Sequence, residues 1–100
     1  MITLKEPYYF KNKDWFFHDP REGRYRLTDK ATPKAIESFI DDYAHYTYGL
    51  FDLPNAVEIA TEWAKHDIED FKKNKSRYTF KRDDHEILNL VAVDGKKLDL

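Results

Sequence analysis

Acidic residues and histidines recur every four positions along two segments, a spacing that places side chains on one face of a helix. The first ridge is Glu37, Asp41 and His45, and the second is Glu58, Glu62, His66 and Asp70. Carboxylates and imidazoles that share a helix face can bind a divalent metal ion. At about 100° per residue, however, both ridges lie far from the apolar stripe of their own helix. We therefore predict two solvated acidic faces and no metal site, with a site shared between two molecules as the alternative.

Two histidines stand beside carboxylates, which are the ingredients of general acid–base catalysis. His18 precedes Asp19, and His85 lies between Asp84 and Glu86. Neighbouring residues of a strand or turn point apart, so neither pair forms a dyad through its sequence position. The chain has no cysteine and only three glycines, and we find no nucleophile motif or phosphate-binding loop. We predict no catalytic residue and no cofactor, and a small enzyme of unassigned reaction ranks third among the readings.

Aromatic and basic side chains alternate in the N-terminal quarter of the chain. We assign a candidate binding surface there to Trp15, Phe17, Arg24, Arg26 and Tyr8. Aromatic residues and arginine are enriched at the cores of protein interfaces. The first prediction is therefore a non-catalytic protein-interaction or self-associating module, with a homodimer as one form. Such residues also stack unpaired bases and neutralise phosphates, so binding of single-stranded nucleic acid is the alternative.

Two helices should position these residues. Their apolar stripes have the three- and four-residue spacing of a buried helix face. In the longer helix, from Asp52 to about Lys73, the stripe is Val57, Ala60, Ala64, Ile68 and Phe71; in the shorter one it is Ile36, Phe39, Ile40 and Tyr43. Thr32 and Pro33 suit the start of the shorter helix, which should end between residues 46 and 49. The short connection predicts an antiparallel pair.

Strands are expected on both sides of the helices. Residues 8–10 are predicted to form a short strand. Residues 15–19 and 24–28 are predicted to form a hairpin around the turn Pro20–Gly23. A four-residue loop places Phe16 and His18 beside Tyr25 and Leu27, whereas a three-residue loop with a bulge places Trp15 and Phe17 there. The sequence leaves both registers open.

The C-terminal part predicts a second hairpin region. Residues 77–81 read as a strand, Asp83 and Asp84 as a turn, and 87–93 as a strand. Asp94 and Gly95 then form a strong hairpin signal before residues 96–100. The competing interpretation is a short helix capped by Asp83 with Glu86 three residues later.

Composition limits these interpretations. The chain has 100 residues, 41% hydrophobic and 36% charged, with a net charge of −2, which suits one domain spanning residues 1–100. The overall prediction is an α+β fold in which two antiparallel helices pack on an antiparallel sheet built from the N-terminal and C-terminal hairpins. The absence of cysteine and of any leader-like or membrane-spanning segment predicts a cytoplasmic protein with no membrane partner.

Overall fold

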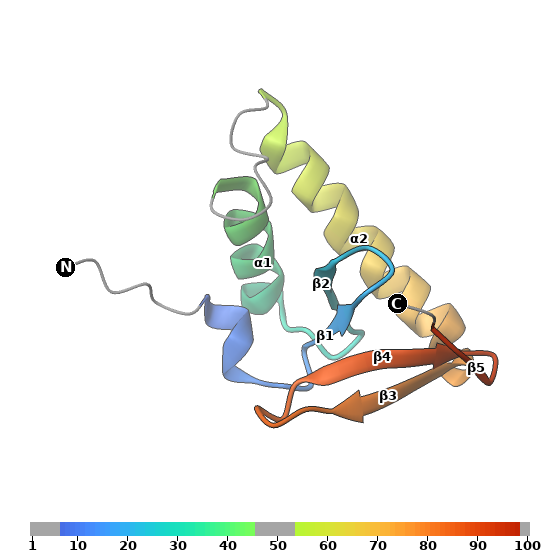
Figure 1. The fold of residues 1–100 in the computed structure, drawn as a ribbon. Helices are drawn as coiled ribbons and strands as arrows, with labels where there is room; N and C mark the ends of the chain where they lie inside the picture. Colours follow the sequence, from blue (N-terminus) through green and yellow to red (C-terminus); the bar gives the residue numbers. More distant parts are fainter. Residues whose placement is uncertain (1–6, 46–53, 99–100) are drawn as a thin grey trace.

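The computed structural model describes residues 7–45 and 54–98 and shows a mixed α+β fold (Figure 1). In chain order the elements are η1 (Tyr8–Lys11), β1 (Phe16–Asp19), β2 (Arg24–Leu27), α1 (Pro33–His45), α2 (Ala56–Asn74), η3 (Lys75–Arg77), β3 (Tyr78–Arg82), β4 (Leu88–Val93) and β5 (Lys96–Lys97). The predicted helices and both predicted hairpins are therefore confirmed. The predicted Asp52 cap and the predicted end of the shorter helix, between residues 46 and 49, lie outside the described residues. The last strand, predicted over residues 96–100, is β5 at Lys96–Lys97.

The sheet has the strand order β2-β1-β4-β3. The short strand β5 pairs with the C-terminal end of β4, at Ala92 and Val93. The prediction of an antiparallel sheet is wrong at one pair of strands: β1 and β4 run parallel, where His18 pairs with Asn89. The composition of the strands explains the arrangement. The apolar β4 takes the central place, whereas β3 carries Lys81 and Arg82 and lies at the margin, as charged edge strands commonly do.

The N-terminal hairpin adopts the register of the four-residue loop. Phe16 pairs with Leu27 and His18 pairs with Tyr25. Because side chains alternate along a strand, these residues share one face, and Phe17, Arg24 and Arg26 share the other. Gly23 closes the turn with a φ of 65°, a conformation that glycine adopts without strain.

Residues 88–93 form a strand and not the competing short helix. Asp94 and Gly95 connect it to β5 with φ values of 53° and 77°, as a type I′ hairpin turn requires. The ladder between β3 and β4 shifts between Thr79 and Phe80, which leaves Val91 as the extra residue of a bulge.

The predicted strand at residues 8–10 is wrong, because these residues form the 3-10 helix η1. A strand would place Tyr8 and Phe10 on one face, whereas a helical turn points the three aromatic rings in different directions. The Tyr9 ring enters the core, 5.5 Å from the rings of Phe16 and Phe39. The Phe10 ring stacks on Phe16 at 4.7 Å.

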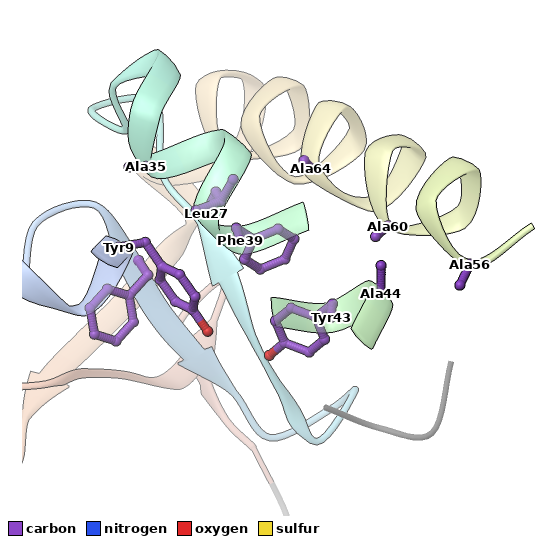
Figure 2. Close-up of a cluster of buried hydrophobic side chains, with 10 residues drawn as sticks. Tyr9, Leu27, Ala35, Phe39, Tyr43, Ala44, Ala56, Ala60 and Ala64 are labelled. Atoms are coloured by element: carbon purple, nitrogen blue, oxygen red, sulfur yellow. The ribbon is translucent and has the colours of Figure 1, made fainter. Parts of the chain in front are cut away.

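The helices run in opposite directions and meet through small side chains. Figure 2 shows Ala44 of α1 facing Ala56 and Ala60 of α2, beside the buried rings of Tyr9, Phe39 and Tyr43. The predicted α2 stripe is correct for Ala60 and Ala64 but wrong for Val57, which is 51% exposed. Ala56 takes its place because positions four residues apart, 56, 60 and 64, form the contact ridge. No helix among the described residues is long and apolar enough to cross a membrane.

Candidate interaction surface

The structure divides the predicted binding residues into two groups. Phe17, Arg24 and Arg26 are buried, with exposed fractions of 1%, 4% and 3%, so their assignment to a surface is corrected. The hairpin register is the reason, since it turns all three toward α2. Tyr8 and Trp15 remain half-buried and in contact with each other.

The two buried arginines bind Asp67, which projects from the inner face of α2. Arg24 Nη1 and Nη2 lie 2.8 and 2.9 Å from the two Asp67 carboxylate oxygens. Arg26 Nε donates a third hydrogen bond to Asp67 Oδ1 at 2.9 Å. The Arg24 guanidinium also lies over the Trp63 ring, 4.5 Å from its centroid. One carboxylate therefore fixes two strand residues against the helix.

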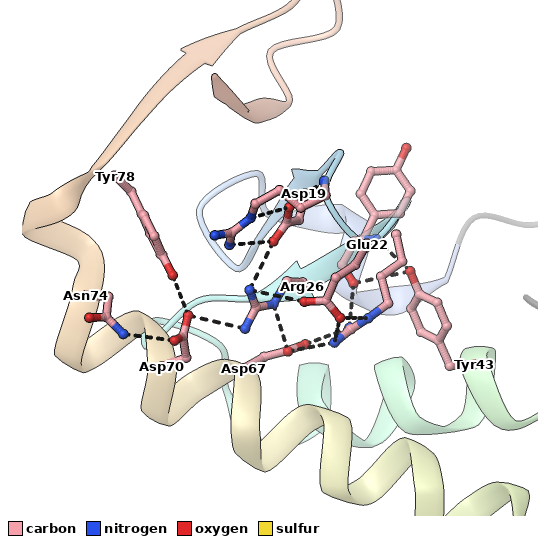
Figure 3. Close-up of polar contacts among 11 residues, drawn as sticks. Asp19, Glu22, Arg26, Tyr43, Asp67, Asp70, Asn74 and Tyr78 are labelled. Atoms are coloured by element: carbon pink, nitrogen blue, oxygen red, sulfur yellow. Dashed lines mark hydrogen bonds and ion pairs between the residues drawn. The ribbon is translucent and has the colours of Figure 1, made fainter. Parts of the chain in front are cut away.

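Arg26 continues this ion network to three further carboxylates (Figure 3). Its Nη1 lies 3.0 Å from Asp19 Oδ2 and 3.4 Å from Glu22 Oε2, and its Nη2 lies 3.3 Å from Asp70 Oδ2. Arg21 binds Asp19 through two nitrogens at 3.0 and 2.9 Å. Among the described residues, no buried side-chain nitrogen or oxygen lacks a hydrogen-bond partner. The network is thus internally satisfied and holds the fold instead of presenting charge to a ligand.

The electrostatics of the network favour its charged state. Burial alone would raise the pKa of Asp19, but hydrogen bonds from Arg21 and Arg26 lower it below the ordinary value. Burial likewise opposes ionisation of Asp70, whose pKa is lowered by the Tyr78 hydroxyl and the charge of Arg26. Both carboxylates are therefore ionised at neutral pH.

Asp67 was not predicted as a site residue, although the sequence carries a signal for it. It lies three residues after Ala64, a spacing that places both side chains on the buried face of α2. Asp70, assigned to a solvated ridge, instead turns inward to Arg26 and Tyr78. The other ridge residues are exposed: Glu37, Asp41 and His45 on α1, and Glu58, Glu62 and His66 on α2. Within residues 7–45 and 54–98, no group of three acidic or histidine side chains could hold a metal ion.

His18 and Asp19 are neighbours in the sequence, but their side chains lie on opposite faces of the sheet. His18 faces the side of the sheet with Tyr25, its ring 5.5 Å from the Tyr25 ring. The Asp19 carboxylate is buried on the opposite side, in the ion network. A hollow of about 370 Å³ lies over β3 and β4, lined by Lys81, Arg82, Asp83, Asp84, Asn89 and Val91. No histidine lines that hollow. A second hollow of about 350 Å³ lies between the end of α1 and the start of α2, and both His45 and Glu58 line it.

The exposed part of the predicted surface gathers side chains from three segments. The rings of Tyr8 and Trp15 lie 5.5 Å apart and are tilted by 33°. Two ammonium groups approach the Tyr8 ring: Lys11 Nζ at 5.1 Å and Lys34 Nζ at 4.5 Å from its centroid. Tyr8 and Lys11 come from η1, Trp15 precedes β1, and Lys34 opens α1. We call these four residues the Tyr8–Trp15 surface.

Comparisons of the chain with protein-family models, with curated proteins and with solved structures find no match.

Proposed function

We propose that the protein is a non-catalytic interaction module that binds a protein partner through the Tyr8–Trp15 surface. The observation that carries this proposal is the convergence of two half-buried aromatic rings with Lys11 and Lys34. Aromatic side chains supply large contact areas at little cost in conformational entropy, and they dominate binding hot spots. Both rings are held in place, Tyr8 by its lysines and Trp15 by Tyr8, so little order would be lost on binding.

The two lysines indicate the chemistry of the partner. Within the described chain, neither Lys11 nor Lys34 forms an ion pair with a carboxylate. An acidic side chain placed beside an aromatic group of the partner would contact both ammonium groups and the exposed ring edges. The proposed partner surface is therefore apolar at its centre and acidic at its rim.

Single-stranded nucleic acid is the alternative ligand for the same residues, because bases stack on aromatic rings and phosphates bind lysine. Two features favour protein. Arg24 and Arg26, which the sequence suggested as phosphate-binding residues, are buried and bound to Asp67. The exposed acidic faces of both helices also repel a polyanion over longer distances.

The test is affinity purification of the tagged protein from cells, with quantitative mass spectrometry of bound proteins. Replacing Lys11→Glu and Lys34→Glu together should reduce recovery of a partner roughly tenfold or more. The matched control is Lys72→Glu with Lys97→Glu, which makes the same charge change at exposed positions elsewhere. Urea denaturation should show that both double variants stay folded, with a free energy of unfolding within about 1–2 kcal/mol of the parent's, since cation–π contacts at exposed sites contribute little.

Equal recovery of every bound protein by the two double variants would contradict the proposal. Binding of an oligo-dT strand that falls steeply with salt and is lost in the Lys11 and Lys34 variant would instead establish the nucleic-acid alternative.

A further inference from the structure

The two margins of the sheet differ in how their backbone groups are satisfied. At the β2 margin, the Tyr43 hydroxyl of α1 accepts a hydrogen bond from the Tyr25 N–H at 2.8 Å. The same hydroxyl donates to the Tyr25 carbonyl at 3.3 Å. This contact closes the β2 edge to another strand.

The outer edge of β3 is open in the described chain. The Arg77 carbonyl accepts from Asp94 N–H at 2.7 Å, and Asp83 N–H donates to the Ile87 carbonyl at 3.0 Å, both toward the β4 hairpin. Since backbone directions alternate along a strand, the N–H and carbonyl groups of Phe80 and Arg82 point away from β4. The described sheet ends at β3, which lies at its margin in Figure 1.

The charges along this edge change sign from one end to the other. Lys75 and Arg77 precede the strand, and Asp83 and Asp84 follow it. An antiparallel copy of the same strand, related by a two-fold axis at Phe80, brings Arg77 opposite Asp83 of the second copy. Thr79 then lies opposite Lys81, and Tyr78 lies opposite Arg82.

Other two-fold registers are less favourable. An axis at Lys81 or Arg82 places that cation opposite itself, and an axis at Thr79 places Arg77 opposite Lys81. Like charges directly across two strands are destabilising. The axis at Phe80 is therefore the register in which opposite charges meet and no cation faces a cation.

We propose that β3 pairs with β3 of a second copy of this chain to form a weak symmetric dimer with one continuous sheet. Phe80 N–H donates to the Phe80 carbonyl of the second copy, and Arg82 N–H donates to its Tyr78 carbonyl. The Tyr78 N–H keeps its bond to the Lys75 carbonyl. A strand of this length buries less area than a standard interface, so dissociation in the micromolar range or weaker is expected.

Thr79 provides the test because its side chain is exposed and faces Lys81 in the dimer. Thr79→Glu adds two cross-strand ion pairs and should lower the dissociation constant roughly two- to thirty-fold. Thr79→Lys is the matched variant, and it should raise the constant by a similar factor because two lysines then face each other. Sedimentation equilibrium between roughly 10 μM and 1 mM covers the range of a weak interface.

Opposite shifts by the two variants, with unchanged urea midpoints, would establish the dimer and its register. Monomers of the parent and of both variants at every concentration would overturn the proposal. A dimer that responds equally to both variants, or to neither, would overturn it as well, because its interface would then lie elsewhere.

Discussion

Both hairpins form ion pairs between arginine and aspartate, but these pairs are buried in the N-terminal hairpin and exposed in the C-terminal one. Arg24 and Arg26 of the N-terminal hairpin are 4% and 3% exposed in their side chains, and their partner Asp67 is fully buried. Arg77, directly before β3, and Arg82, the last residue of β3, have side chains that are 52% and 40% exposed and bind Asp94 and Asp14. The contact distances are alike, at 2.7 to 3.0 Å. Burial, and not distance, therefore decides which pairs hold the fold together.

The edges of the hairpins follow the same division. Tyr43 closes the β2 edge from within the core, whereas β3 is the last strand of the described sheet and carries Lys81 and Arg82 along its edge. The N-terminal hairpin therefore anchors α2, whereas the C-terminal hairpin carries the edge at which we propose that a second copy pairs.

The largest expected effect comes from removing the buried carboxylate. Asp67→Ala leaves Arg24 and Arg26 buried without their shared partner, and it should reduce the free energy of unfolding by about 3–5 kcal/mol. Asp14→Ala is the matched control, since it removes the carboxylate that binds the exposed Arg82. That change should cost about 0–1 kcal/mol. Urea denaturation measures both, and similar losses for the two variants would contradict the comparison.

A smaller effect is expected when the β2 edge is opened. Tyr43→Phe keeps the buried ring but removes the hydroxyl that binds both backbone groups of Tyr25, at a cost of about 1–3 kcal/mol. Tyr78→Phe removes a hydroxyl that donates a hydrogen bond to the Asp70 carboxylate in a half-buried site, where it binds no backbone group that a strand would need. In urea denaturation, Tyr78→Phe should therefore lower the free energy of unfolding by less than Tyr43→Phe does. The reverse order would show that the Tyr43 hydroxyl does not close the edge.

Local signals explain why the helices and hairpins could be predicted. Thr32 and Pro33 begin α1, Gly23 closes the first turn, and Asp94 with Gly95 forms the second. Each of these signals depends on neighbouring residues alone. Of the two hairpin registers that the sequence left open, the structure has the one that places Phe16 and His18 beside Tyr25 and Leu27.

The burial of the arginines assigned to the candidate surface was harder to predict, because it depends on contacts between residues that are distant in the sequence. Arg24 and Asp67 are 43 positions apart, and nothing near Arg24 identifies α2 as its partner. The arginines were therefore read as surface residues, in accordance with their usual exposure. The parallel contact of β1 with β4 joins residues as distant as His18 and Asn89. Of the predicted surface, the structure keeps Tyr8 and Trp15 together although η1 replaces the expected strand.

The smallest expected effect is a difference between the two hairpins in how pH and salt change the free energy of unfolding. Hydrogen bonds from arginine lower the pKa of Asp19 despite its burial, and a hydrogen bond from Arg77 lowers the pKa of Asp94. A carboxyl whose pKa is lowered by folding stabilises the protein above its unfolded pKa of 3.8. This contribution is lost as the pH falls through the lower, folded pKa. The difference in stability between the parent and Asp19→Asn, or Asp94→Asn, should therefore shrink below about pH 4.

Salt should then distinguish the two carboxylates, because it screens exposed charges far more than buried ones. Asparagine suits position 94, whose φ of 53° is one that it tolerates. In roughly 0.5 M NaCl, the pH dependence due to Asp94 should weaken, whereas that due to Asp19 should persist. Urea denaturation of the parent and both variants at several pH values, with and without salt, measures the effect. Equal salt sensitivity at the two positions would mean that solvent reaches the buried network as readily as the exposed pair.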